Sequence, residues 1–306
     1  HGVTGPDEYT ALVDDNAYTN AMARMNLRYA FEVASELSEE VPDRWEALHE
    51  KVGLTDGETI DWRLAADAMY IPHDRDLGIT PQDDDFLQKE AWDFENTPES
   101  KYPLLLHFHP LTIYRFQVLK QADVVLADFL LGEEFNDDLK RANFDFYEPL
   151  TTGDSSLSAC IQAIMSAELG YHPAAMRHFH HALYMDLGDI AGNTTDGVHM
   201  ASVGGVWMAL IYGFAGMRDV RGTISFDPRM PEDWSEMQFK LHVRHAELSV
   251  KLNHESIAFA SNAPIDVLVA GTVHSVSPGG GTIVNYQACG EIVSRKTRSS
   301  ESKRSR

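Results

Sequence analysis

Cysteines, basic residues and long apolar runs are all scarce in this chain. Its 306 residues include 2 cysteines, Cys160 and Cys289, far apart and in unlike contexts. They give neither a disulfide framework nor metal-ligand spacing, and they fit a reducing compartment. The chain has 25 lysines and arginines and 47 aspartates and glutamates, so its net charge is -22. This acidic charge argues against a nucleic-acid partner. No run of about 18 apolar residues occurs, so we expect no membrane span.

The overall composition of the chain is typical of a folded protein. Hydrophobic residues make up 43% of the chain and charged residues 24%, so a packed core is feasible and disorder is not indicated. Helical spacing predicts a helical domain over 1–219. From there, alternating strand-like segments predict a small antiparallel β-domain over 220–290. Residues 291–306 are predicted to be a disordered basic tail, since the last thirteen, 294–306, carry no apolar side chain.

Within the helical part, Tyr18, Met22, Met25 and Tyr29 recur at helical spacing and predict one apolar stripe on a helix over 16–37. A helix over 111–131 would carry Lys120 and Gln121 at its middle. Residues 71–110, rich in proline, aspartate and histidine, are expected to form a long structured loop. The further helices that we predict cover 42–52, 61–69, 136–146, 155–169, 173–187 and 201–216.

A rigid corner near the start of the chain carries two consecutive carboxylates. Gly5 and Pro6 favour a tight turn, and Asp7 and Glu8 follow it with Tyr9 behind them. A carboxyl group that is buried beside an aromatic ring has a raised pKa, which suits a general acid. The alternative is a surface pair before a helix, where negative charge suits the N-terminus.

Two further segments have the features of an anion site. Ser155 and Ser156 stand at a predicted helix N-terminus, where hydroxyls, free N–H groups and the helix dipole favour an oxyanion. His199 lies just before another predicted helix, in which Gly204 and Gly205 allow a close approach of the backbone. The alternatives are plain capping by the serines and a hydrogen-bonded loop histidine.

Five long motifs, in this order, resemble the inverting disaccharide phosphorylases of the maltose, trehalose and kojibiose phosphorylase family. They are GVTGPDEYTALVDDNAYTN (2–20), LKQADV (119–124), FYEPLTTGDSSLSACIQAIMSAELG (146–170), DGVHMASVGGVWMALIYGFAGMR (196–218) and ISFDPRMPEDWSEMQFKLHVRHAELSV (224–250). The resemblance implies a mainly α fold, the second half of an (α/α)6 toroid followed by the β-domain. It also implies that this sequence is the C-terminal part of a longer enzyme.

The resemblance implies reversible phosphorolysis of an α-linked glucose disaccharide with inversion, giving β-glucose 1-phosphate and a free sugar. The family needs no cofactor, because inorganic phosphate is the co-substrate, and it is usually a cytoplasmic homodimer. The partners implied are therefore a disaccharide and phosphate, without nucleic acid or membrane. The implied roles are proton donation by Glu8, sugar binding by Lys120, Gln121 and Glu148, and phosphate binding by Ser155, Ser156 and His199.

Two rival hypotheses remain from the residues. An inverting hydrolase of the same fold would need a second carboxylate about 6.5–9.5 Å away to activate water, and Glu148 or, less well, Asp154 could supply it. A fragment lacking its other half could also be inactive and associate through uncovered apolar faces. A metal site is not expected, since His178 and His181 share a helix face that His180 does not.

Overall fold

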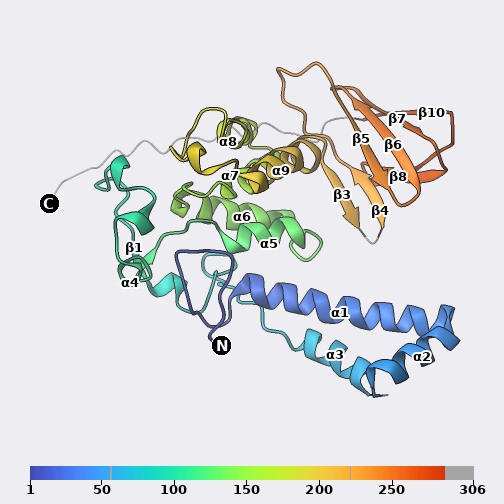
Figure 1. Ribbon diagram of the computed structural model, residues 1–306, viewed down its shortest axis with the longest axis horizontal. Helices are drawn as coiled ribbons and strands as arrows, with labels where there is room; N and C mark the ends of the chain where they lie inside the picture. Colours follow the sequence, from blue (N-terminus) through green and yellow to red (C-terminus); the bar gives the residue numbers. More distant parts are fainter. Residues whose placement is uncertain (56, 221, 287–306) are drawn as a thin grey trace. The chain divides into compact units, whose positions relative to one another are not determined.

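The computed structural model describes residues 1–55, 57–220 and 222–286, so Cys289 and the predicted basic tail lie outside the described residues. The chain divides into two compact units. The first contains 1–162 and 185–202, and the second contains 163–184 and the described residues from 203 on (Figure 1). The structure is helical with β-sheets in its C-terminal part. No helix among the described residues is both long enough and apolar enough to cross a bilayer.

Three helices follow the first loop of the first unit. Helix α1 (Ala17–Glu40) begins after Asn16, whose side chain accepts a hydrogen bond from the Thr19 N–H. Helices α2 (Pro42–Val52) and α3 (Glu58–Asp67) come next, and α3 packs along α1 (Figure 1). The predicted stripe is confirmed for its first three members, which pack on the apolar cluster of Ala127 and Leu131. It is wrong for Tyr29, which is 63% exposed.

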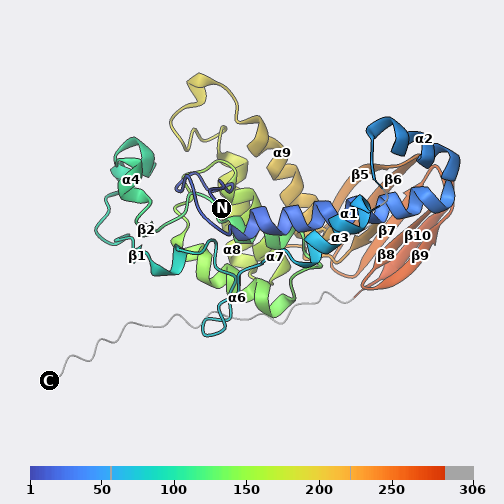
Figure 2. The same ribbon diagram turned by 90° about the horizontal axis from the view of Figure 1, so that it is seen from below.

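The segment from 71 to 117 contains the long loop predicted over 71–110, and short elements hold it. Strands β1 (Glu90–Ala91) and β2 (Phe116–Gln117) pair in parallel, and α4 (Pro110–Ile113) is a single turn. Three short 3-10 turns lie at Phe86–Gln88, Glu99–Lys101 and Leu104–Leu106. In both views α4 and α2 lie at opposite ends of this unit (Figure 1 and Figure 2). Trp92 and Leu104 pack with Tyr9 in a buried cluster, so this loop has its own core.

The predicted helix over 111–131 is wrong. Helix α5 is limited to Asp123–Leu130, and Lys120 and Gln121 lie in the connection before it rather than within a helix. The backbone there is extended, because the Leu119 N–H donates to the Leu150 carbonyl at 2.9 Å and the Thr152 N–H donates to the Leu119 carbonyl at 2.8 Å. These long-range bonds replace the bonds that a helix would have made locally.

The remaining helices lie close to their predicted bounds. Helix α6 (Asp137–Tyr147) is capped by the Asn136 side chain and leads into the 3-10 turn Glu148–Leu150. Helix α7 (Ser158–Glu168) begins three residues later than predicted. The others are α8 (His172–Tyr184), the turn Thr194–Asp196, α9 (Met200–Met208) and a π-helical stretch over Ala209–Phe214.

The β-module of the second unit contains two four-stranded sheets. One has the order β10-β7-β6-β5 and the other β3-β4-β8-β9. Both enclose one apolar core that includes Phe226, Leu248 and Phe259. The antiparallel prediction is right for most neighbours but wrong for β4 and β8, which pair in parallel. The strands are β3 (Met217–Val220), β4 (Thr223–Phe226), β5 (Met237–Val243), β6 (Ala246–Leu252), β7 (Ser256–Ser261), β8 (Ile265–Val269), β9 (Thr272–Val276) and β10 (Gly281–Asn285).

Candidate active site

A closed loop at the start of the first unit presents the two carboxylates. Val3 and Val13 exchange both backbone hydrogen bonds at 2.9 Å, and the Gly2 N–H donates to the Asp14 carboxylate at 2.6 Å. We call residues 3–13 the acid loop. The bridge holds the two ends of the loop together, so the Gly-Pro corner projects from a fixed base.

The neighbouring carboxylates of the acid loop have opposite environments. Asp7 is fully buried, whereas the Glu8 side chain is 52% exposed and accepts from the Lys120 Nζ at 2.7 Å. Of the two carboxyl groups that the sequence places at this corner, Asp7 is therefore the buried one. Glu8 instead has one cationic neighbour and an open side.

The Lys120–Gln121 segment joins the acid loop to the serine turn. The Gln121 Nε2 donates to the Pro6 carbonyl, and the Gln121 Oε1 accepts from the Ser155 hydroxyl at 2.7 Å. The Ser158 hydroxyl donates to the Lys120 carbonyl at 2.7 Å. The structure thus brings together five of the site residues that the sequence predicts: Glu8, Lys120, Gln121, Ser155 and the neighbouring Ser156.

Asp154 ties a third segment to the acid loop. The hydroxyl of the buried Tyr9 donates to one Asp154 oxygen, and the Thr152 hydroxyl donates to the other at 2.5 Å. The Tyr9 oxygen also accepts from the Leu104 N–H at 3.1 Å. Burial, followed by the neighbouring Asp154 charge, raises the pKa of Tyr9 well above its usual value. With both oxygens engaged, Asp154 holds the loop and is poorly placed to activate water.

His199 is oriented by Asp186. Its Nδ1 lies 2.6 Å from one Asp186 oxygen, and its backbone N–H donates to the other at 3.0 Å. Because a carboxylate only accepts, Nδ1 carries a proton, so Nε2 is the atom left to meet a ligand. That Nε2 lies 3.4 Å from the Asn193 Nδ2.

The first turns of α7 and α9 lie side by side, because the Cys160 Sγ contacts the Ser202 carbonyl at 3.7 Å. Ser155 and Ser156 lie in the turn just before α7, and the Ser155 hydroxyl accepts from the Leu157 N–H at 3.2 Å. His199 directly precedes α9. The serine turn and the histidine therefore lead into two adjacent helix N-termini.

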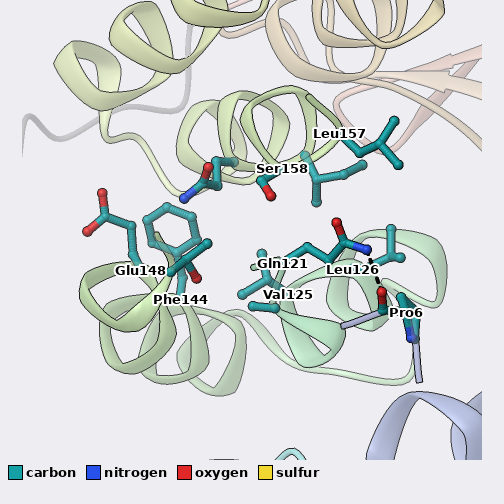
Figure 3. A pocket seen from close by; sticks show the side chains of 12 residues that line it. Pro6, Gln121, Val125, Leu126, Phe144, Glu148, Leu157 and Ser158 are labelled. Carbon is teal, nitrogen blue, oxygen red and sulfur yellow. Dashed lines mark hydrogen bonds between the residues drawn. The ribbon is translucent and has the colours of Figure 1, made fainter. Parts of the chain in front are cut away.

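A cavity of about 130 Å³ lies behind the Lys-Gln segment. Figure 3 shows Glu148 at one end and Pro6 at the other, with Gln121 and Val125 between them. The lining is mostly apolar, and the Glu148 carboxylate is directed away from Gln121. Ligand pockets usually measure about 300–1,000 Å³, so this cavity alone is too small for a disaccharide.

Comparison with known proteins places the chain in a family. Residues 1–208 match the glycosyl hydrolase family 65 central catalytic domain. The chain belongs to glycosyl hydrolase family 65. Residues 217–276 match the C-terminal domain of the same family.

Several family 65 proteins are similar to this chain. An α,α-trehalose phosphorylase of Geobacillus stearothermophilus is 46% identical over 277 residues, covering 90% of this chain and 36% of that protein. A kojibiose phosphorylase of Halothermothrix orenii is 35% identical over 256 residues, covering 84% and 33%. A solved structure from the human microbiome, provisionally assigned as a kojibiose phosphorylase, has a TM-score of 0.81 at 28% identity, covering 94% of this chain and 39% of its own. The family 65 chain thus spans about a third of the length of these curated relatives.

Sequence reasoning misses the buried carboxyl pair of this family 65 site. It identifies Asp7 only as the neighbour of Glu8, and Asp123 not at all. The Asp123 carboxylate accepts from the Asp7 N–H at 2.6 Å and from the Asn16 Nδ2 at 2.8 Å. A signal is present, since Asp123 and Asp128 interrupt the apolar run ADVVLADFLL, and isolated carboxylates in such a run are buried only with partners. Among the described residues, no three His, Cys, Asp or Glu side chains cluster closely enough to hold a metal ion.

This pair makes the stability of the family 65 chain pH-dependent. Burial raises the pKa of Asp7 to about 6, and burial together with the Asp7 charge raises the pKa of Asp123 to about 7. Between about pH 4 and these values, the native state keeps protons that the unfolded chain has lost. The free energy of unfolding is therefore expected to fall as the pH rises from about 4 to about 7. Since one pKa unit corresponds to about 1.4 kcal/mol, Asp7 alone accounts for roughly 3 kcal/mol.

Urea denaturation at half-unit pH intervals measures this effect. Asp123→Asn should flatten the curve, because it removes one titrating carboxyl and the charge that acts on the other. Asp76→Asn, at an exposed loop position, should leave the slope unchanged. A slope in Asp123→Asn equal to that of the wild type would assign the pH dependence to other groups.

Proposed function

We propose that the complete protein carrying this chain catalyses reversible, inverting phosphorolysis of an α-linked glucose disaccharide. The observation that carries the proposal is the hydrogen-bond chain Pro6–Gln121–Ser155. It joins the acid loop to a serine turn before a helix N-terminus, so a proton donor and an anion site are built as one unit. The 46% identity to an α,α-trehalose phosphorylase supports the same reaction.

In the proposed reaction, Glu8 in its protonated form gives its proton to the glycosidic oxygen. Phosphate attacks the anomeric carbon from the opposite face, so the C–O bond to the leaving sugar breaks as the C–O bond to phosphate forms. The products are β-glucose 1-phosphate and a free sugar. Glu8 is left as a carboxylate, which the Lys120 ammonium 2.7 Å away stabilises. In the substrate complex, the remaining N–H donors of the Lys120 Nζ and the Gln121 Nε2 reach sugar hydroxyls, with Glu148 ordering the cavity wall.

Phosphate is proposed to bind through Ser155, Ser156 and His199. The serines offer hydroxyls and lie in the turn before the N-terminus of α7. The Asp186 contact at 2.6 Å holds the His199 ring in place, so that its Nε2 is the atom that meets the phosphate. Phosphate is already a nucleophile, so neither a cofactor nor a second catalytic carboxylate is required.

We also propose how the domains are built and how the complete enzyme is assembled. The helices of 1–219 would form the second half of an (α/α)6 toroid, with 220–290 as the β-domain and 291–306 as a basic tail. The complete enzyme would be a cytoplasmic homodimer that uses a disaccharide and phosphate. The fold similarity to a solved structure at a TM-score of 0.81 supports the helical domain and the β-domain of this proposal.

The test compares turnover with and without phosphate. The complete protein is incubated with trehalose, maltose and kojibiose in turn, and glucose 1-phosphate and glucose are quantified. We expect glucose 1-phosphate from one of the three sugars, and only when phosphate is present. Glucose alone, formed at a rate indifferent to phosphate, would instead indicate hydrolysis and would direct attention to Glu148 as the base.

A further inference from the structure

The fully buried carboxylate of Asp7 connects the acid loop to the Lys-Gln segment by direct contacts. Its Oδ1 accepts from the backbone N–H groups of Tyr9, Lys120 and Gln121, at 3.2, 2.9 and 3.4 Å. Its Oδ2 accepts from the Gln82 Nε2 at 3.2 Å. Asp7 thus binds backbone on both sides of the Glu8–Lys120 contact, one residue from Glu8 and on Lys120 itself.

The Asp123 carboxylate also holds Asp7 in place. The Asp123 Oδ1 accepts from the Asp7 N–H at 2.6 Å, and the Asp123 N–H donates to the Gln82 Oε1 at 3.1 Å. Gln82 therefore bridges the two aspartates, with its oxygen committed to one and its nitrogen to the other. The side-chain orientation of Gln82 is set by this pairing, so its Nε2 must face Asp7.

We propose that Asp7 is a positioning residue that sets the Glu8 carboxylate against Lys120 and, through them, against the bound sugar. This inference rests on the proposed function for the identity of the reaction. With no exposed surface, Asp7 cannot touch a substrate. Its effect on the reaction must pass through the backbone that it holds.

The chemistry of the contacts requires an acceptor at both Asp7 oxygens, because every partner is a donor. Asparagine keeps the shape but presents an NH₂ group either to Gln82 Nε2 or to the backbone N–H groups. Asp7→Asn therefore breaks either the contact with Gln82 or the contacts with the backbone N–H groups. The double variant Asp7→Asn with Gln82→Glu exchanges amide and carboxylate, so that the introduced amide donates to the introduced carboxylate and the Asp123 N–H keeps its acceptor.

The experiment measures kcat and KM of phosphorolysis in the complete protein. A misplacement of about 1 Å costs on the order of 100-fold in rate, so Asp7→Asn should lower kcat by about 100-fold. The loss in kcat should exceed any change in KM, since Glu8 acts in the transition state whereas Lys120 and Gln121 also contact the bound sugar. The double variant should recover most of kcat. Asp128→Asn is the matched control, since Asp128, on helix α5, is as fully buried as Asp7 but contacts Asn143 instead.

A second readout does not depend on activity. Hydrogen exchange at the Lys120 and Gln121 amides should accelerate in Asp7→Asn, return in the double variant and be unchanged in Asp128→Asn. Equal losses of kcat in Asp7→Asn and Asp128→Asn, or a folded double variant without recovery, would overturn the inference while leaving the function intact. If the wild type shows no phosphate-dependent turnover, the proposed function fails. The exchange data alone then test whether Asp7 holds the Lys120 and Gln121 backbone. Unaltered exchange in Asp7→Asn would overturn that inference.

Discussion

Glu8→Gln is expected to lower kcat of phosphorolysis by about 1,000-fold, within the range of about 10²–10⁴ that general acid catalysis contributes. Glutamine has the shape of glutamate, and its amide oxygen can still accept from the Lys120 Nζ. In the wild type this Nζ lies 2.7 Å from the Glu8 carboxylate. Only the transferable proton is lost. The KM values should therefore change by less than about threefold, because the group acts in the transition state.

The leaving group provides the sharpest check on this prediction. Fluoride departs with little help from an acid, so α-glucosyl fluoride should restore most of the lost rate in Glu8→Gln. Glu46→Gln, at an exposed position on α2, should match the wild type with both substrates. An equal loss with disaccharide and fluoride would show that the substitution damages the site rather than removing an acid.

Gly5→Ala is expected to destabilise the first unit by about 4 kcal/mol, because there is no room for a side chain at this corner. A Cβ at Gly5 would lie 1.9 Å from the Asp123 Oδ2 and 2.7 Å from the Asn16 Nδ2. Overpacking of a core typically costs about 1–3 kcal/mol. Displacing a buried carboxylate from its donors adds to this. Urea denaturation followed by circular dichroism measures the change.

Gly57→Ala is the matched control, since Gly57 likewise lies in the first unit and a Cβ there meets nothing within 4 Å. It should change the free energy of unfolding by less than about 1 kcal/mol. If Gly5→Ala proves as mild as Gly57→Ala, the close approach of Gly5 to Asp123 does not contribute to stability.

The sequence predicts elements well where the stop and start signals are local. Helix α2 has the predicted bounds, because Pro42 is suited to a first turn and Gly53, at a φ of 70°, provides the left-handed end. Helix α6, which follows the capping residue Asn136, lies within one residue of its predicted bounds at each end. Such signals depend on a few neighbouring residues and require no knowledge of the tertiary structure.

Long-range contacts account for the errors. Apolar residues around Lys120 have helical spacing, but the Lys120 N–H donates to Asp7, 113 residues away, and no local pattern contains that information. Whether Asp7 or Glu8 is the buried carboxyl depends on Gln82 and Asp123 for the same reason. Alternation likewise predicts β4 and β8 as strands without showing that they pair in parallel.

The contacts of the acid loop also set the order in which the site can assemble during synthesis. The loop precedes Gln82, Asp123 and Asp154 in the chain, and the Tyr9–Asp154 contact spans 145 residues. At roughly 5–20 residues per second, the ribosome needs roughly 7–30 s to make the intervening chain. At the start of that interval the nascent acid loop has none of these partners, and Asp7 is exposed to water as an ordinary carboxylate. Gln82, Asp123 and Asp154 then become available in that order. Formation of the Tyr9–Asp154 contact thus marks the earliest moment at which the chain can hold the complete acid loop in place.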